Sequence, residues 1–344
     1  MTDLRITRRA ALAGMAALPF VPGVARAEVG GITRLDPALD AIVDVASPIE
    51  VIASRYKWAE GPVWHIWERC LYFSDVPSNI LYQWRPREGA KPFLDPSGLA
   101  GPIPPGIREA GSNGLAFRDS EILMADSGSR AIASVHLGTK KKTILADRYE
   151  GKRFNSCNDL VERKGGGIYF TDPPYGLAEG DKSPLKELPF NGVFYRAKDG
   201  TITAIDKRLT RPNGVALNLK QDILYVAISD PERPEVLAYD LGEDGLPKGP
   251  PRLFHDARPQ LAAKLPGLPD GLKVDVRGNV YATGPGGVHV VSPEGKLLGI
   301  IATGKAIANC AFGEDGSTLF LTSSDVVARV RLRAKGYYAF EVRY

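Results

Sequence analysis

Six residues with carboxylate or amide side chains recur along the sequence, each at the start of a similar apolar segment. They are Glu60, Asn113, Asn158, Asn213, Asp270 and Asn309, and they lie 39 to 57 residues apart. Asn and Asp before Gly are common turn residues, so each of them read alone indicates a turn. Glu has no such preference, and the shared position in all six segments predicts that the side chains converge in the fold. Converging buried carboxylates repel each other unless a cation lies between them.

The donor set of these six residues predicts the kind of cation. It combines two carboxylates with amide oxygens and contains no thiolate or imidazole. Hard oxygen donors suit Ca²⁺, Mg²⁺ or Mn²⁺, and Ca²⁺ is favoured because its coordination tolerates irregular ligands and leaves room for water or substrate. The His and Cys residues are few and have none of the spacings typical of zinc sites, and we expect three free thiols.

The segments that carry the six residues predict how these side chains are brought together. Each continues as a short alternating strand, a turn and a second strand rich in β-branched, aromatic or aliphatic residues. The second strands are expected at 71–73, 122–124, 168–170, 224–226, 280–282 and 319–321, and outer strands at 80–84, 192–196 and 236–240. Repeats of this kind are typical of propeller blades, whose innermost strands surround a central channel.

The sequence therefore predicts an all-β fold, a six-bladed β-propeller with a central metal-binding channel. Its 37 Gly and 27 Pro among 344 residues suit short strands joined by turns. Ring closure is expected where the segments from Ile49 to Ala53 and from Tyr337 to Val342 meet in one blade.

Residues 1–27 have the pattern of a twin-arginine signal peptide. Arg8 and Arg9 precede a weakly apolar, Ala-rich stretch, and the small residues at 25 and 27 are typical of a cleavage site. The remaining chain is expected to comprise an N-terminal linker at 28–47 and the propeller at 48–344. We therefore expect the precursor to bind the twin-arginine export machinery, and the mature protein to be periplasmic or otherwise exported, without stable membrane insertion.

The charge of the chain argues against a nucleic-acid partner. The formal net charge is +4, and removing residues 1–27, with their four Arg and one Asp, leaves +1. No cluster of Lys and Arg interleaved with aromatic residues remains. The run from Lys140 to Lys142 is expected to form a solvated turn.

Several motifs that occur in order along the chain carry a family resemblance. They are EGPVW at Glu60, SNGLAF at Asn113, NDLV followed by GGIYFTDPPYG within 158–176, RPNGVAL at Asn213 and LPDGLKVD at Asp270. Over about residues 50–325 the chain resembles the family of senescence marker protein (regucalcin), gluconolactonase and luciferin-regenerating enzyme. The resemblance implies a six-bladed propeller with one divalent cation on its axis, and hydrolysis of a sugar-acid lactone as its reaction.

The resemblance also implies roles for individual residues. The metal ligands would be Glu60, Asn213 and Asp270, with Asn158 reaching the metal directly or through water or substrate. Asp270 would also be the catalytic base, taking a proton from the attacking water while the metal polarises the lactone carbonyl. The sugar hydroxyls would be bound by Asn113, Asn158 and Tyr175, with Asn309 as a further candidate. The cation would be Ca²⁺ in preference to Mg²⁺, Mn²⁺ or Zn²⁺.

Two other functions are left open by the sequence. Related propellers hydrolyse different bonds, so a metal-dependent esterase or a phosphotriesterase-like hydrolase fits the same ring. A non-catalytic propeller that binds a protein or a sugar is the third possibility, and the joint presence of Glu60, Asn213 and Asp270 argues against it. The long loops Asp95–Gly111 and Leu177–Asn191 are expected to form the rim or lid that sets specificity.

Overall fold

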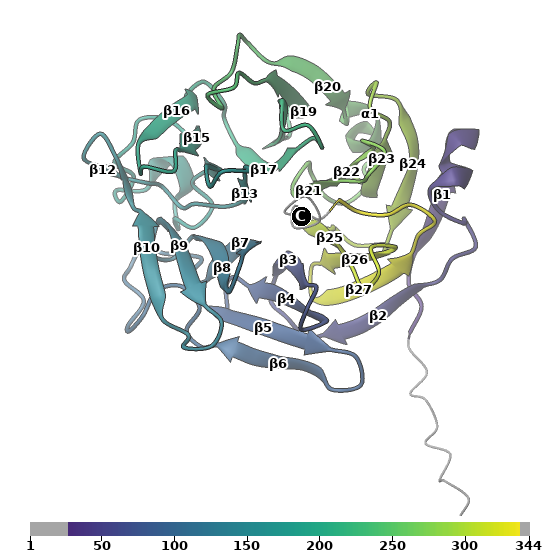
Figure 1. Ribbon diagram of the computed structural model, residues 1–344, viewed down its shortest axis with the longest axis horizontal. Helices are drawn as coiled ribbons and strands as arrows, with labels where there is room; N and C mark the ends of the chain where they lie inside the picture. The colour runs from purple at the N-terminus through teal and green to yellow at the C-terminus, as the bar shows by residue number, and fades with distance from the viewer. Residues whose placement is uncertain (1–26, 338–344) are drawn as a thin grey trace, which may run out of the picture.

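The computed structural model describes residues 27–337, and these residues form a ring of six β-sheets (Figure 1). The predicted signal peptide, apart from Ala27, and residues 338–342 of the predicted closing segment lie outside the described residues. Within 27–337, no helix is both long enough and apolar enough to span a membrane. The predicted all-β, six-bladed propeller is confirmed.

Each blade is an antiparallel sheet whose first strand lies next to the central channel. Blades one and two contain β3 (Ala59–His65), β4 (Cys70–Asp75), β5 (Ile80–Arg85) and β6 (Gly89–Leu94), then β7 (Ser112–Arg118), β8 (Glu121–Asp126), β9 (Ala131–His136) and β10 (Lys142–Ala146). Blades three and four contain β13 (Leu160–Glu162), β14 (Ile168–Asp172), β15 (Gly192–Arg196) and β16 (Ile202–Asp206), then β17 (Pro212–Leu217), β18 (Ile223–Asp230), β19 (Arg233–Asp240) and β20 (Arg252–Asp256).

The last two blades each take a strand from the N-terminal part of the chain. Blade five contains β21 (Leu272–Val274), β22 (Val280–Gly284), β23 (Gly287–Val291), β24 (Leu297–Ala302) and β1 (Gly31–Arg34). Blade six contains β25 (Asn309–Gly313), β26 (Thr318–Ser323), β27 (Val326–Arg331) and β2 (Ile49–Ser54). The short elements are the hairpin of β11 (Arg148–Tyr149) and β12 (Lys152–Arg153), the helix α1 (Arg258–Ala262), and the 3-10 helices η1 (Pro37–Ala41) and η2 (Gly180–Lys182).

The predicted strands inside the blades are confirmed. All six predicted second strands lie within β4, β8, β14, β18, β22 and β26, and the three predicted outer strands lie within β5, β15 and β19. The second strands are buried almost throughout, because each packs between the sheets of two neighbouring blades. Figure 1 shows the six first strands, β3, β7, β13, β17, β21 and β25, around the centre of the ring.

The prediction for ring closure is right for the N-terminal strand and wrong for its partner. β2 pairs with β27 of blade six, with Ile49 opposite Val330 and Ser54 opposite Val326. β27 follows β26 through a tight turn in which Ser324 has a φ of 54°. Because this hairpin places β27 third in the sheet, β2 takes the fourth position. Tyr337 lies instead beside blade five, where its N–H donates to the carbonyl of Val274 (3.3 Å).

Residues 28–47, predicted as a linker, fold onto blades five and six. β1 pairs with β24, the outer strand of blade five. The 3-10 helix η1 begins after Asp36, whose side chain accepts a hydrogen bond from the N–H of Ala38 (2.8 Å). Leu39 and Val43 are fully buried in the apolar cluster between the two blades.

Apolar packing between neighbouring blades holds the ring together. At the closure, Trp64 of blade one stacks on Phe320 of blade six, with ring centroids 5.4 Å apart. Cys70, Cys157 and Cys310 are buried free thiols, as predicted. The run from Lys140 to Lys142 is only partly a solvated turn, because Lys142 forms an ion pair of 2.7 Å with the fully buried Asp126.

Candidate active site

The glycines that follow the repeated residues allow neighbouring blades to approach closely. A Cβ atom on Gly61 would lie 1.9 Å from the carbonyl oxygen of Asn113, and one on Gly214 would lie 2.2 Å from that of Asp270. Any larger residue at these positions would push the innermost strands apart. The Asn-Gly pairs therefore serve close packing around the channel. Asn113 and Asn213 themselves lie within β7 and β17, not in turns.

Hydroxyl groups on the second strands fix the backbone that carries the repeated residues. Ser74 of blade one donates to the carbonyl of Asn113 in blade two (2.9 Å), and Thr171 of blade three donates to that of Asn213 in blade four (2.6 Å). Ser229 of blade four donates in the same way to the carbonyl of Pro269, next to Asp270. Blades one, three and four thus each fix the backbone that carries the functional residue of the next blade.

A cavity of about 430 Å³ lies at the end of the channel where the innermost strands begin. It is lined by all six residues that the sequence predicts for metal and substrate, namely Glu60, Asn113, Asn158, Tyr175, Asn213 and Asp270. Sequence reasoning missed the other lining residues, which are Trp58, Arg108, Glu109, Ser229, Gly267, Leu268, Ala306 and Ile307. Asn309 does not line the cavity; its Oδ1 accepts hydrogen bonds from Lys273 Nζ (3.2 Å) and from the N–H of Cys310 (2.9 Å).

The side chain of Asn213 is held with its oxygen unpartnered. Its Nδ2 donates to Ser229 Oγ (2.9 Å), while Oδ1 is buried and has no hydrogen-bond partner among the described residues. A buried amide oxygen without a partner is costly, and the cost disappears when the oxygen binds a cation. The orientation of Asn213 therefore fits a cation ligand.

The carboxylates that share the cavity repel each other in the chain alone. Burial raises the pKa of Glu60, and the charge of Asp159 raises it further. Burial likewise raises the pKa of Asp270 well above its usual value, and the charges of Glu60 and Asp159 add to this effect. A cation between Glu60 and Asp270 would remove both penalties.

The available donors restrict which cation could bind. Within residues 27–337, no group of three or more His, Cys, Asp and Glu side chains comes together as a metal site. A cation in this cavity would thus depend on amide oxygens as well as on the carboxylates of Glu60 and Asp270. Such a donor set fits a divalent cation that prefers oxygen ligands.

Asp159 is a buried acid beneath the cavity that sequence reasoning did not single out. It accepts hydrogen bonds from the N–H groups of Leu160 (2.9 Å) and Val215 (3.3 Å), which tie blade three to blade four. Burial raises its pKa, and the charge of Lys273 opposes this shift. Asp159 is part of the NDL motif at 158–160, which sequence analysis did single out. The motif alone does not show that Asp159 both accepts hydrogen bonds from backbone N–H groups and places a charge near the cavity.

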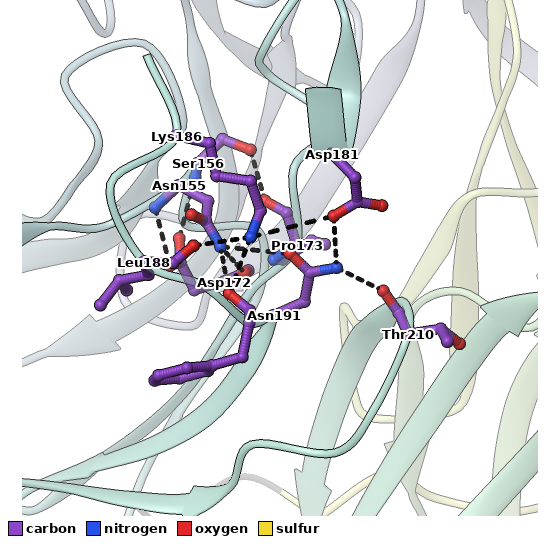
Figure 2. Close-up of polar contacts among 10 residues, drawn as sticks. Asn155, Ser156, Asp172, Pro173, Asp181, Lys186, Leu188, Asn191 and Thr210 are labelled. Carbon is purple, nitrogen blue, oxygen red and sulfur yellow. Dashed lines mark hydrogen bonds and ion pairs between the residues drawn. The ribbon is translucent and has the colours of Figure 1, made fainter. Parts of the chain in front are cut away.

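A hydrogen-bond network around Asp172 supports the segment that carries Asn158 (Figure 2). The Asp172 carboxylate accepts hydrogen bonds from the N–H groups of Asn155 (2.7 Å) and Ser156 (2.8 Å). Asn155 Nδ2 donates to the carbonyls of Asp172 and Phe190, each at 3.0 Å. Burial raises the pKa of Asp172 to about 7, and the two backbone N–H groups oppose the shift. This network fixes the backbone immediately before Asn158.

The same network anchors the loop 177–191, predicted as part of the rim. Asn191 Nδ2 donates to Asp181 (2.9 Å) and to the carbonyl of Thr210 (2.6 Å), and Lys186 donates to the carbonyl of Leu188 (2.7 Å). Figure 2 shows these side chains gathered around Asp172. None of the residues 177–191 lines the cavity. The other predicted rim loop, 95–111, does line it, through Arg108 and Glu109.

Comparisons with known proteins agree with this fold and site. Residues 58–325 match the family described as "SMP-30/Gluconolactonase/LRE-like region". A gluconolactonase of Zymomonas mobilis is 44% identical, over 98% of this chain and the whole of that protein. The structure of a gluconolactonase from Xanthomonas campestris superposes with a TM-score of 0.76 at 28% identity, covering 90% of this chain and 98% of that one.

A more distant solved structure shares the fold alone. A calcium-binding protein named regucalcin, from Agrobacterium tumefaciens, has a TM-score of 0.66 at 16% identity and covers 90% of this chain and 96% of its own. The family match covers most of the propeller, including every predicted site residue, and the resemblance seen in the motifs is confirmed. The chain is a member of the SMP-30/gluconolactonase/LRE-like family.

Proposed function

We propose that this protein is a divalent-cation-dependent lactonase that hydrolyses a sugar-acid lactone of the gluconolactone type. The observation that carries the proposal is the buried, unpartnered Oδ1 of Asn213 in a cavity that also holds Glu60 and Asp270. The 44% identity to a gluconolactonase over nearly the whole chain supports the choice of reaction. The cavity, about 430 Å³ in volume, has room for a small-molecule lactone.

The residues present fit one cation, with Ca²⁺ favoured over Mg²⁺, Mn²⁺ or Zn²⁺. Glu60, Asn213 and Asp270 would hold it, and Asn158 would contribute directly or through water. When bound, the cation supplies positive charge that polarises the lactone carbonyl and stabilises negative charge on its oxygen.

The side chains of the cavity supply the remaining chemistry. Asp270 accepts a proton from the water that attacks the carbonyl carbon. The bond between this carbon and the ring oxygen then breaks, and the ring oxygen leaves as a hydroxyl group after taking up the proton. Asn113, Asn158 and Tyr175 orient the lactone through its hydroxyl groups.

The proposal is tested by measuring lactone hydrolysis with the purified protein after chelation and after adding back Ca²⁺, Mg²⁺, Mn²⁺ or Zn²⁺ separately. We expect hydrolysis of D-glucono-δ-lactone to disappear on chelation and to return with a divalent cation. An aryl ester and a phosphotriester are included in the same assay. Cation-dependent cleavage of either one without any lactone hydrolysis would favour the esterase or phosphotriesterase-like alternative, and no cleavage at all would favour a binding propeller.

We further propose that the reaction takes place in the periplasm, because residues 1–27 have the twin-arginine pattern. Replacing both Arg8 and Arg9 with Lys is expected to retain the precursor in the cytoplasm, measured by cell fractionation. Unchanged export of that variant would show that another route is used.

A further inference from the structure

Glu109 is a carboxylate of the cavity that has no part in the proposed cation site or in proton transfer. It lies on the loop 95–111 and lines the same cavity as Glu60 and Asp270. Its side chain is only 17% exposed. Burial raises its pKa, and its charge in turn raises the pKa of Asp270. Arg108 donates to one oxygen of this carboxylate, and the remaining lone pairs can accept hydrogen bonds from a molecule in the cavity.

Glu109 is held in place by a junction at Gly176. The carbonyl of Gly176 accepts hydrogen bonds from the N–H groups of Arg108 (2.8 Å) and Glu109 (3.3 Å). The N–H of Gly176 donates in turn to Ser156 Oγ (2.8 Å), which belongs to the segment supported by Asp172. Tyr175 is the residue immediately before Gly176 in the chain. One rigid junction therefore positions both Glu109 and Tyr175 at the cavity.

The cavity is lined by both polar and apolar side chains. The polar side chains beyond the proposed cation ligands are Arg108, Glu109, Asn113, Tyr175 and Ser229, and the apolar ones are Trp58, Leu268, Ala306 and Ile307. A molecule that carries both hydroxyl and C–H groups matches this lining. Among the described residues, the side-chain partner of Glu109 is Arg108, at 3.1 Å, and Arg108 is 52% exposed at the rim.

The chemistry of a carboxylate restricts what it can recognise. An ionised carboxylate only accepts hydrogen bonds, so its partner in the substrate must be a hydroxyl or another donor. A substrate without that donor would leave the acceptor sites of Glu109 that Arg108 does not occupy cut off from water and without a partner, and sites of this kind discriminate against such analogues.

We propose that Glu109 is a specificity-determining residue that accepts hydrogen bonds from the hydroxyl groups of a polyhydroxylated lactone. This inference rests on the proposed lactonase function and deepens it. The enzyme selects lactones that carry hydroxyl groups, and it selects against lactones with the same ring and no hydroxyl groups.

The test compares D-glucono-δ-lactone with δ-valerolactone, which has the same ring without hydroxyl groups. The quantity measured is the ratio of kcat/KM for the first lactone to that for the second, in Ca²⁺-loaded protein. We expect Glu109→Ala to lower this ratio by about tenfold or more, and Glu109→Gln, which keeps an acceptor oxygen, to lower it less. The matched control is Glu243→Gln, on an exposed residue between β19 and β20, at the end of blade four opposite to Ser229, which should leave the ratio unchanged.

A second variant tests the junction that positions Glu109. A Cβ atom on residue 176 would lie 2.7 Å from the Cβ of Ser156, so Gly176→Ala displaces the loop while leaving the carboxylate in the chain. We expect this variant to lower the same ratio, with its folding checked by circular dichroism and thermal unfolding.

The outcomes separate this inference from the function on which it rests. If the wild-type protein hydrolyses neither lactone with any cation, the proposed function fails and this inference fails with it. If the wild type hydrolyses gluconolactone and the folded Glu109→Ala variant keeps the same ratio, only the role of Glu109 is overturned. An equal loss on both lactones also overturns it, because that result assigns Glu109 to the chemistry or the fold rather than to hydroxyl recognition.

Discussion

The two ends of the central channel are built from the same six strands and carry different side chains. At one end, Glu60 and Asn213 line the cavity of about 430 Å³ with carboxylate and amide groups. At the other end, the same strands finish in Trp64 and Leu217, which line a smaller cavity of about 180 Å³ together with other aromatic and aliphatic side chains. The first residues of each innermost strand thus serve the site, and the last residues serve packing between blades. One short strand can serve both purposes because its first and last residues lie at opposite ends of the channel.

This division has a physical origin in how the blades meet. At the polar end, a glycine after the functional residue lets the neighbouring blade approach, and a hydroxyl on the second strand holds the backbone. At the apolar end, large side chains fill the wedge between blades, as Phe312 does against Tyr281 with ring centroids 4.9 Å apart. Variants at the two ends should consequently have separable effects on activity and on stability.

The largest effect is expected from Asp270→Asn at the polar end. The amide cannot accept the proton from water and is a weaker cation ligand, so kcat/KM for gluconolactone should fall by about a thousandfold or more. Because Asp270 is buried near the like charges of Glu60 and Asp159, its removal should leave the free energy of unfolding of the cation-free protein unchanged or higher.

Steady-state kinetics and urea unfolding of the same preparation check both expectations for Asp270→Asn. The matched control is Asp240→Asn, at an exposed position at the end of β19. Turnover close to wild type would remove Asp270 from its proposed role. A large loss of stability would show that the two ends of the channel are not divided by function.

The next largest effect is expected from Phe312→Ala at the apolar end. Phe312 is 6% exposed, and its truncation should lower the free energy of unfolding by about 3–5 kcal/mol. The kcat/KM of the folded protein should stay within about twofold of wild type, since distant sites act independently. Urea unfolding measures the first quantity and an assay well below the transition measures the second.

The control for Phe312→Ala is Leu253→Ala, which truncates a side chain that is 51% exposed and should cost little stability. If Phe312→Ala instead abolished activity in folded protein, the apolar end would have to be counted as part of the site.

The repeat in the sequence was sufficient to predict the blades and the carboxylate and amide residues of the cavity, because both depend on local patterns. About 15 consecutive residues specify each strand pair. A ring of blades brings equivalent positions together regardless of the length of the loops between them. Five of the six repeated residues consequently line one cavity. Asn309 is the exception, because its amide turns to Lys273, a neighbour that its own segment does not specify.

The features that sequence reasoning missed depend on contacts between distant segments. Ser74 and Thr171 stood at the ends of predicted second strands, yet their partners are residues of the next blade. Glu109 reaches the cavity only because Gly176, 67 positions further along the chain, holds its backbone. The closing strand β27 was missed because two C-terminal segments, β27 and residues 337–342, were candidates to pair with β2. The hairpin between β26 and β27 places β27 beside β2. Local periodicity carries no information about these choices.

The smallest effect is a change in the pH dependence of stability, and it concerns a buried histidine pair that supports the polar end. His289 Nε2 lies 3.0 Å from the carbonyl of Pro285 and must donate to it, so its Nδ1 accepts a hydrogen bond from His255 Nε2 (2.8 Å). The next residue, Gly286, donates to the carbonyl of Pro266, beside the cavity-lining Gly267. His289 is consequently neutral in the folded protein, and the lowered pKa of His255 keeps that imidazole neutral near pH 7 as well.

Acid should weaken this support. Burial, together with the neighbouring His289, lowers the pKa of His255 to about 4, whereas the unfolded chain has a His pKa of about 6.5. Between these values the unfolded state binds more protons, so stability is lost as the pH falls from about 6.5 to 4, by up to roughly 3 kcal/mol. His255→Gln keeps a donor and cannot be protonated, and it should remove this part of the pH dependence.

Urea unfolding of wild type and His255→Gln at several pH values isolates the contribution of His255, because the other titrating residues are present in both proteins. His136→Gln, at a partly exposed position on β9, is the control and should keep the wild-type slope. Since the pair supports only the wall at Pro266 and Gly267, acid should lower the stability of Phe312→Ala by the same amount as that of wild type. A larger acid loss in Phe312→Ala would mean that the two ends of the channel are energetically coupled through blade five, and that the separation of site from packing is incomplete there.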